Sequence, residues 1–205
     1  MVTGKGLPVF PGIVAGRIYL YQKTEVQTQR SQHPDLETEK ARFSAAKQKA
    51  DEQLAALYEK ALKEVGEQES MILDVQRMMM DDPDFNEAVL SELEAGNSAE
   101  QAVDKAGNRF AEFFMGLDDA YMQARSADIL DVSQRLLGIL GGRSNTALQI
   151  DQPSIIIADD ITPSETVQLD KKKVLALVTR NGSRHSHAQA PSLHEGRKEK
   201  HCYVN

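Results

Sequence analysis

The pattern of apolar residues changes twice along the chain, and this change most constrains the fold. Residues 12–20 read GIVAGRIYL, a β-branched and aromatic run framed by glycines, which predicts a strand. Across about 35–140 the apolar residues recur in steps of three, four or seven, which is helical spacing. Short β-branched runs return at 155–158 and 174–178. The sequence therefore predicts an α/β fold with a helical block inserted between the strands of one small sheet.

Four helices are expected in the inserted block. The first is long and amphipathic and begins near residue 35. The second carries the apolar residues of 71–79 and ends at DDPD, because Pro83 disfavours helix at the residue before it. One helix ends near Gly96 and the capping-box sequence after it opens the next, which makes at least three, and a fourth spans about 118–140. These signals predict an antiparallel four-helix hairpin bundle.

Composition limits the class of protein. The chain has 205 residues, 40% of them hydrophobic, which fits one or two compact domains. No apolar run approaches the roughly 18 residues that a membrane span requires. The single cysteine, Cys202, has no partner for an internal disulfide, and no His-rich spacing offers a zinc site. We therefore expect a cytoplasmic protein that is not bound to a membrane and holds no structural metal.

The net charge of −7 conceals two blocks of opposite sign. From Glu64 to Asp131 there are 17 acidic residues against 4 basic ones, whereas from Lys171 to His201 there are 8 basic against 2 acidic. The overall charge argues against nucleic-acid binding, while the acidic block would attract a basic partner and the basic block a phosphate. Alternatively, both blocks are simply the solvated faces of helices and loops.

A candidate phosphate site follows the last β-branched run, in the residues TRNGSRHSHAQA. Gly182 lies in a turn before a segment that can open a helix, and backbone N–H groups at a helix N-terminus bind anions. Arg184 can add bidentate charge to phosphate oxygens. A histidine at this place, His185 or His187, has an imidazole that is a nucleophile near neutral pH and can attack a phosphoryl group. From these residues alone, His185 and His187 are explained as readily as ordinary exposed loop residues.

Four segments together point to a known family. They are GIVAGRIYL at 12–20, ILDVQRMMMDDPDF at 72–85, YMQARSADILDVSQRLL at 121–137 and IIIADDITPSETVQLD at 155–170. In order and spacing they resemble the N-terminal, phosphohistidine half of enzyme I of the bacterial phosphoenolpyruvate:sugar phosphotransferase system. The resemblance implies a small swivelling phosphohistidine α/β domain, residues 1–30 and 146–205. It also implies an inserted four-helix subdomain, residues 31–145, that binds the phosphocarrier protein HPr.

The resemblance assigns His187 as the catalytic residue that accepts the phosphoryl group. Gly182 and Arg184 match the family's glycine-rich signature and would support the phosphate. Thr166 matches a threonine that hydrogen-bonds the active histidine, although its hydroxyl could also serve as a helix cap. Two residues depart from the signature, since Ser183 stands where a second glycine is usual and His185 where threonine is usual. His185 is accordingly an alternative phosphoacceptor.

The resemblance also places an HPr-binding surface on the helical block. The residues expected there are Asp74, Gln76, Met78, Met79, Asp82, Asp84 and Arg125. Methionines would supply an adaptable apolar patch, and the acids would complement a basic partner.

Some of these residues have alternative roles. At helical spacing at least one of the three consecutive methionines must face the core, and Met79 is as readily a core residue as a contact. Arg125 is equally explained by an intrahelical pair with Asp128 or Asp131. Gln76 stands where the family usually has histidine.

The residues after His187, AQAPSLHEGRKEKHCYVN, depart from the family's small-residue helix and lack an apolar stripe. The family's C-terminal barrel, which binds phosphoenolpyruvate and Mg²⁺ and provides dimerisation, would lie beyond the printed residues, so neither cofactor nor metal is expected here. The predicted function is phosphoryl transfer from that domain through His187 to HPr, in sugar transport. The alternatives are a catalytically impaired HPr-docking fragment and the phosphohistidine domain of a dihydroxyacetone-kinase phosphocarrier.

Overall fold

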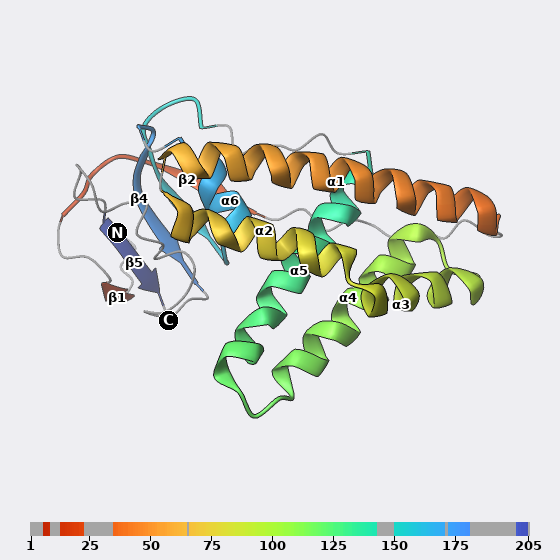
Figure 1. The fold of residues 1–205 in the computed structure, drawn as a ribbon. Coiled ribbons are helices and arrows are strands. Elements are labelled where there is room, and N and C mark those ends of the chain that lie inside the picture. The colour runs from red at the N-terminus through yellow and green to blue at the C-terminus, as the bar shows by residue number, and fades with distance from the viewer. Residues whose placement is uncertain are drawn as a thin grey trace. The chain divides into compact units, whose positions relative to one another are not determined.

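The computed structural model describes residues 6–8, 13–22, 35–64, 66–142, 150–170, 172–180 and 200–204 (Figure 1). The chain divides into two compact units. The sheet unit comprises Met1–Thr24, Lys60–Ser70 and Thr146–Asn205, and the helical unit comprises Glu25–Glu59 and Met71–Asn145. Residues 60–70, which the sequence analysis assigned to the helical subdomain, thus group with the sheet.

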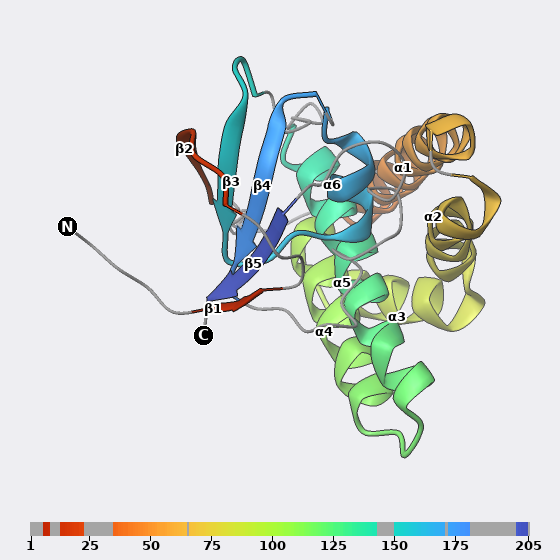
Figure 2. The ribbon, with the colours of Figure 1, turned by 90° about the vertical axis from the view of Figure 1, so that its left-hand side faces the viewer.

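The sheet unit is built on strands from both ends of the chain. In chain order the strands are β1 (Gly6–Pro8), β2 (Arg17–Tyr21), β3 (Ser154–Ala158), β4 (Val174–Thr179) and β5 (Lys200–Val204). Their order across the sheet is β1-β5-β4-β3-β2, as Figure 2 shows. Neighbouring strands from β2 to β5 are parallel, and β1 pairs antiparallel with β5.

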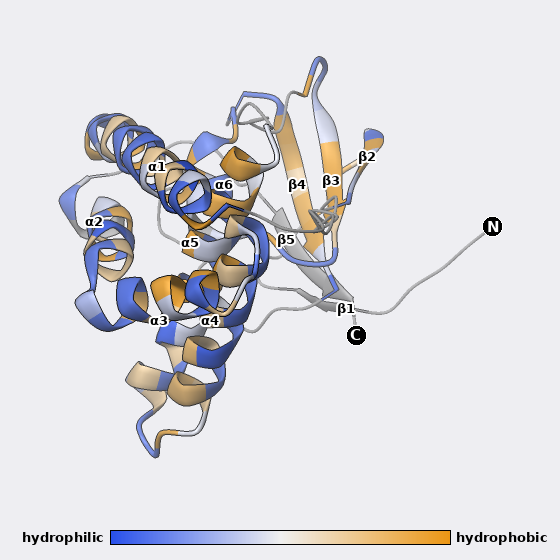
Figure 3. Cartoon of the chain, turned by 90° about the vertical axis from the view of Figure 1, so that its right-hand side faces the viewer, coloured by the Kyte–Doolittle hydropathy of each residue, from blue (hydrophilic) through white to orange (hydrophobic). Residues whose placement is uncertain are grey.

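The apolar runs of β3 and β4 form the centre of this sheet because their side chains alternate between the core and the opposite face. Ile156 and Leu177 are buried in a cluster with Ile161 and Leu169, from the segment that connects the two strands. Figure 3 shows β3 and β4 as largely hydrophobic. The predicted strands at 155–158 and 174–178 are confirmed to within a residue. β2 begins only at Arg17, where pairing with β3 starts.

The helical block consists of α1 (Leu36–Glu64), α2 (Glu67–Asp81), α3 (Pro83–Glu94), α4 (Ala99–Met115) and α5 (Ala120–Leu140). A short helix, α6 (Pro163–Gln168), lies between β3 and β4. The predicted α/β class with an inserted helical block is confirmed. The described block has one helix more than the four expected, because Pro83 opens a separate helix as its first residue and Asp82 caps that helix.

Local capping signals fix the helix ends. The predicted box after Gly96 is confirmed: Ser98 Oγ accepts from Gln101 N at 3.3 Å, and Gln101 Oε1 accepts from Ser98 N at 3.2 Å. Gly96 itself has φ of +86°, a conformation that ends α3 and that other residues rarely adopt. Asp119 caps α5 by accepting from the backbone N–H groups of Tyr121 and Met122.

The helices α4 and α5 pack closely where Gly107 of α4 faces Ser133 of α5. A Cβ atom added at Gly107 would lie 2.7 Å from Cβ of Ser133 and nearer still to its hydroxyl oxygen, so only glycine fits. The core of the helical unit surrounds this contact, with Phe85, Val103, Leu136 and other apolar side chains fully buried. No helix in the described part of the chain is long and apolar enough to cross a bilayer.

A charged network joins α1 to the start of α4. The buried carboxylate of Glu39 accepts from Ala99 N at 2.6 Å, which satisfies an N-terminal backbone donor of α4. Arg42 bonds both Glu39, at 2.8 Å, and Glu100. Desolvation is the largest single influence on Glu100 and opposes its ionisation, but the hydrogen bond and charge of Arg42, together with hydrogen bonds from the backbone and Ser98, outweigh it and lower the pKa of that carboxyl. The same bond to Glu100, with a smaller contribution from Glu39, raises the pKa of Arg42.

Candidate functional site

The carboxyl ends of three parallel strands meet at one edge of the sheet. Tyr21 of β2 is in register with Ala158 of β3, and Ala158 is in register with Thr179 of β4. The loops that leave this edge carry Asp159, and then Arg180 and the residues that follow it. In open parallel sheets, ligands bind at this edge. The predicted phosphate-site sequence therefore begins at the edge where the fold favours a binding site.

The first turn of α6 lies in the loop between β3 and β4 and carries Thr166. Thr162 caps the helix: its hydroxyl accepts from Glu165 N at 3.3 Å, while Glu165 Oε2 accepts from Thr162 N at 2.8 Å. Thr166 donates its hydroxyl proton to the carbonyl of Thr162 at 2.9 Å. This bond stabilises the turn, while Thr162 is the cap, and the oxygen lone pairs of Thr166 are left to accept the hydrogen bond predicted with the active histidine.

A hydrogen bond links this turn to the edge strand. The hydroxyl of Tyr21 donates to Oε1 of Glu165 at 2.5 Å, across 144 positions of sequence. The sequence analysis missed both residues, because no local pattern relates the end of β2 to α6. The only available signal was Glu165 at the third position after Thr162, which marks a capping box.

β4 ends at Thr179, and Arg180 follows it. The guanidinium of Arg180 lies 3.0 Å from a carboxylate oxygen of Asp159, and both side chains are mostly exposed. Thr179 is fully buried, and its hydroxyl makes no hydrogen bond in the described part of the chain. The edge thus combines one exposed ion pair with hydroxyl groups from β4 and α6.

The predicted nucleophile and its closest supports lie outside the described residues. These are His187, Gly182 and Arg184, together with Ser183 and His185, which depart from the family signature. Their assigned roles stay predictions. Thr166 is the one member of the predicted phosphate site that the described residues include.

The three consecutive methionines of α2 have three different environments. Met78 is 68% exposed, Met79 is half-buried and Met80 is completely buried. The prediction that at least one of them faces the core is confirmed by Met80. Met78 and Met79 remain available to contact a partner.

The predicted acidic contacts are exposed, but they differ in what else they do. Asp82 caps α3 by accepting from Asp84 N at 2.9 Å and Phe85 N at 3.2 Å. Asp74 lies 3.6 Å from Arg77, whose shorter contact is with Asp51 at 2.6 Å. Asp84 contributes to helix capping only through its backbone N–H. A substitution of the Asp84 side chain is therefore the cleaner test of surface charge.

Gln76 and Arg125 are both largely withdrawn from the surface. Gln76 is buried and donates to Oδ2 of buried Asp131 at 2.9 Å, so any effect of Gln76 on a partner would be indirect. The Arg125 side chain is only 14% exposed, and it pairs with buried Asp128 at 2.9 Å. Its guanidinium carbon lies 4.6 Å from the centre of the Tyr121 ring. The intrahelical alternative for Arg125 is thus the one seen in the structure.

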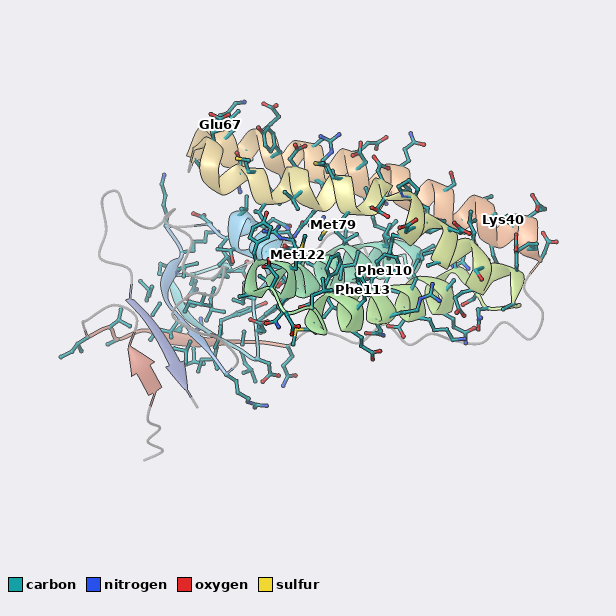
Figure 4. All side chains as sticks on the ribbon, turned by 60° about the horizontal axis from the view of Figure 1, so that its bottom comes forward. Lys40, Glu67, Met79, Phe110, Phe113 and Met122 are labelled. Atoms are coloured by element: carbon teal, nitrogen blue, oxygen red, sulfur yellow. The ribbon has the colours of Figure 1, made fainter. Side chains whose placement is uncertain are left out.

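Exposed apolar residues also gather around the turn between α4 and α5. Phe113 and Met115, near the end of α4, and Tyr121, at the start of α5, are 60–65% exposed, and Met122 is 41% exposed. Figure 4 shows the labelled side chains of Met122 and Phe113 in the helical unit with Met79 and Phe110. Sequence analysis missed this group, although the adjacent residues Phe113, Phe114 and Met115 cannot all face one core.

Within the described residues, no three His, Cys, Asp or Glu side chains are grouped so as to hold a metal ion. The chemistry available there is hydrogen bonding and charge at the sheet edge, and apolar and acidic contact on the helical unit.

Two protein families match the sequence. Residues 5–125 match the family described as PEP-utilising enzyme, N-terminal, and residues 150–191 match the family described as PEP-utilising enzyme, mobile domain. The second match runs from β3 through α6 and β4 to just beyond His187.

Curated relatives are phosphoenolpyruvate-protein phosphotransferases. The enzyme of Lactococcus lactis subsp. lactis (strain IL1403) is 35% identical over 189 residues, and that of Mycoplasma capricolum subsp. capricolum is 36% identical over 186 residues. Each alignment covers 90% of this chain but 32% of the relative. The chain therefore spans about a third of the length of these relatives.

Solved structures agree with the fold. A solution NMR structure of Enzyme I superposes with a TM-score of 0.77 at 28% identity, covering 98% of this chain and 82% of that chain. The N-terminal domain of "Enzyme 1 - Nitrogen" superposes with a TM-score of 0.65 at 21% identity, covering 98% and 83% of the two chains. The second similarity supports the fold alone.

Proposed function

Because the chain belongs to the family of PEP-utilising enzymes defined by their N-terminal domain, we propose that it is a phosphoryl-transfer domain acting through His187. The observation that carries the proposal is the mobile-domain match over residues 150–191, which includes His187 and, before it, β3, α6 and β4. The chain is homologous to phosphoenolpyruvate-protein phosphotransferases over their N-terminal part. In the proposed pathway, phosphoenolpyruvate is the ultimate donor and HPr the acceptor.

The reaction at His187 is an exchange of one P–N bond for another. In the forward direction a neutral ring nitrogen of the carrier's histidine attacks phosphorus of phosphorylated His187, and the bond between phosphorus and the His187 imidazole breaks. The electron pair of that bond returns to the His187 ring, which keeps hydrogen on its other nitrogen and so leaves neutral, and no oxidant or co-reactant is required. Phosphorylation of His187 by phosphorylated HPr is the same step in reverse. In the transition state the negative charge on the three equatorial oxygens of the phosphoryl group must be stabilised. This role is proposed for Gly182 and Arg184. This exchange needs no metal in the chain.

Thr166 is proposed to orient His187. Its hydroxyl proton is committed to the Thr162 carbonyl at 2.9 Å, so toward an imidazole the hydroxyl acts as an acceptor. An acceptor holds the ring nitrogen that carries hydrogen and leaves the other nitrogen as the nucleophile. This selection of the nucleophilic nitrogen is the role proposed for Thr166.

HPr is proposed to dock on the helical unit. Exposed Met78, Phe113, Met115 and Tyr121 offer an apolar surface, and Met122 and half-buried Met79 extend it. Asp74 and Asp84 supply exposed negative charge, which suits a basic partner and raises the rate of association. Apolar anchors would then give most of the binding energy, and the acids most of the dependence on salt.

The tail after His187 favours a second candidate function. The mobile-domain match ends at residue 191, while the chain continues to residue 205 with a sequence that has no apolar stripe. A weakened support for His187 would leave a module that docks HPr without accepting phosphate. The two functions differ in one observable, the phosphorylation of His187.

Phosphate transfer from phosphorylated HPr to the purified chain tests the proposal. Intact mass and site mapping under alkaline conditions, which preserve phosphohistidine, should show one phosphoryl group on His187. The variant His187→Ala should lose it, and the matched variant His185→Ala should keep it. HPr binding without phosphorylation would support the docking module instead, and phosphate on His185 would refute the assignment of His187.

Two charge-reversal variants test HPr docking separately from phosphoryl transfer. Asp84→Lys should weaken HPr binding and reduce its dependence on salt, whereas Glu37→Lys, at an exposed position on α1 outside the proposed surface, should have little effect. Equal binding by the two variants would show that the acidic part of the surface is wrongly placed.

A further inference from the structure

Tyr21, at the end of β2, contacts both the sheet core and α6. The ring of Tyr21 is partly buried and packs against the apolar cluster that contains Ile156 and Leu177. From that fixed position its hydroxyl donates to Oε1 of Glu165 at 2.5 Å. A ring held by packing loses little further freedom in making this bond, so Tyr21 is a rigid anchor for Glu165.

Glu165 connects Tyr21 to the turn that carries Thr166. Its second oxygen, Oε2, accepts from Thr162 N at 2.8 Å. The carbonyl of Thr162 in turn accepts from both the backbone N–H and the hydroxyl of Thr166, each at 2.9 Å. Three consecutive hydrogen bonds therefore connect the edge strand to the side chain of Thr166.

The short helix needs such an anchor. α6 has six residues, and a helix of that length is not stable by itself because nucleation costs more than so few hydrogen bonds return. Buried Ile161 and Leu169 hold its two ends in the core. The bond from Tyr21 is a side-chain contact that acts directly on the capping carboxylate of α6.

We propose that Tyr21 and Glu165 are positioning residues for phosphoryl transfer: together they hold the turn of α6 that presents the Thr166 hydroxyl to His187. The inference rests on the proposed function and adds the residues that set the orientation of its hydrogen-bond acceptor. Neither residue touches the phosphoryl group. Each acts through Thr162 and Thr166.

The chain offers a matched pair of variants. Tyr21→Phe removes only the hydroxyl that bonds Glu165 and keeps the packed ring. Tyr19→Phe removes a hydroxyl two residues earlier on β2, from a half-buried tyrosine whose hydroxyl makes no hydrogen bond in the described part of the chain. Both variants should remain folded by far-UV circular dichroism. Only Tyr21→Phe should slow phosphoryl transfer from phosphorylated HPr, by about tenfold for one lost hydrogen bond to a charged acceptor.

A second readout separates positioning from stability. The ¹⁵N chemical shifts of the His187 imidazole report which ring nitrogen carries hydrogen. We expect one dominant tautomer in the wild-type chain and in Tyr19→Phe, and a mixture in Tyr21→Phe. Glu165→Ala should behave like Tyr21→Phe, whereas Glu165→Gln, which retains a side-chain oxygen, should recover part of the rate.

The outcomes distinguish this inference from the proposed function. If the wild-type chain accepts no phosphate from phosphorylated HPr, the proposed function fails and the positioning role fails with it. If the wild-type chain accepts phosphate, and Tyr21→Phe matches Tyr19→Phe in both transfer rate and His187 tautomer, only the positioning role is wrong.

Discussion

The helical unit and the sheet unit use their polar side chains in different ways. In the helical unit polar groups are buried and paired inside the packing, as Gln76 with Asp131 and Arg125 with Asp128. In the sheet unit the hydrogen-bonded side chains of Tyr21 and Glu165 lie at the edge where the parallel strands end. Buried pairs define which helix packs where, whereas the carboxyl edge of an open parallel sheet is where ligands bind. The helical unit thus fixes its packing with buried polar pairs, whereas the sheet unit places hydrogen-bonded side chains at the edge where its parallel strands end.

The strongest test of this comparison contrasts a buried and an exposed phenylalanine of the helical unit. Phe85 is fully buried and packs edge-on against Phe110 at 5.6 Å, so Phe85→Ala should lower the free energy of unfolding by about 3–5 kcal/mol. Phe113→Ala, at a 62% exposed side chain, should change stability little but weaken HPr binding. Urea unfolding followed by circular dichroism, together with calorimetric titration of HPr, measures both. A large loss of stability in Phe113→Ala would show that Phe113 is part of the packed core, and this result would contradict its place in the proposed docking surface.

The next effect concerns the close approach of α4 and α5. Gly107→Ala gains helix propensity but forces a methyl group against Ser133, and the clash should dominate, with a net destabilisation of about 1–2 kcal/mol. Gly138→Ala is the control, because in the described part of the chain no atom beyond its neighbours and the backbone of α5 lies within 4 Å of the added Cβ. That variant should be stabilised by up to about 1 kcal/mol. Thermal unfolding compares the two, and equal shifts would show that the helices do not meet closely at Gly107.

Two capping residues separate the roles of the two units. Ser98→Ala in the helical unit and Thr162→Ala in the sheet unit each remove a capping-box hydroxyl, and each should cost about 1 kcal/mol. Only Thr162→Ala should also slow phosphoryl transfer from HPr, because the Thr162 cap lies in the turn that holds Thr166. A matching slowdown in Ser98→Ala would mean that the transfer rate merely follows stability.

The smallest effect is the pH dependence that Glu100 contributes. Because its folded pKa lies below the ordinary value of 4.5, its stabilising contribution is complete above that value and is lost as pH falls through the lowered pKa. Glu100→Gln should therefore reduce stability at pH 7 by about 1 kcal/mol or less and flatten the acid limb of the stability curve. Glu37→Gln, an exposed carboxylate 3.8 Å from Lys40, is the control. An unchanged acid limb in Glu100→Gln would contradict the role of the Arg42 bond.

Features encoded by local sequence were predictable. The capping box of Ser98 and Gln101, the stop at Gly96 and the runs that became β3 and β4 each depend on residues a few positions apart. The position of Pro83 was noted as well, yet the sequence analysis did not count the separate helix that it opens. Burial of one methionine followed from helical spacing, but only the fold identifies it as Met80.

Features that depend on distant pairing were not predictable. Residues 6–8 and 200–204 pair as β1 and β5 across almost the whole chain, and nothing in either short segment signals the other. The bond from Tyr21 to Glu165 also spans 144 positions. Spacing arguments cannot detect contacts of this kind, because their geometry is set only when the sheet assembles.

The central claim is that this chain is a phosphoryl-transfer domain. Its most direct test is the transfer of the phosphoryl group from the chain back to HPr. The chain would be phosphorylated with phosphorylated HPr, separated from it and mixed with unphosphorylated HPr, with mass spectrometry of both proteins over time. The account predicts that phosphate mapped to His187 moves back to HPr, and that Tyr21→Phe slows the step in both directions. Phosphate that never appears on His187, or that stays on the chain when HPr is added, would contradict the assignment of a phosphoryl-transfer domain.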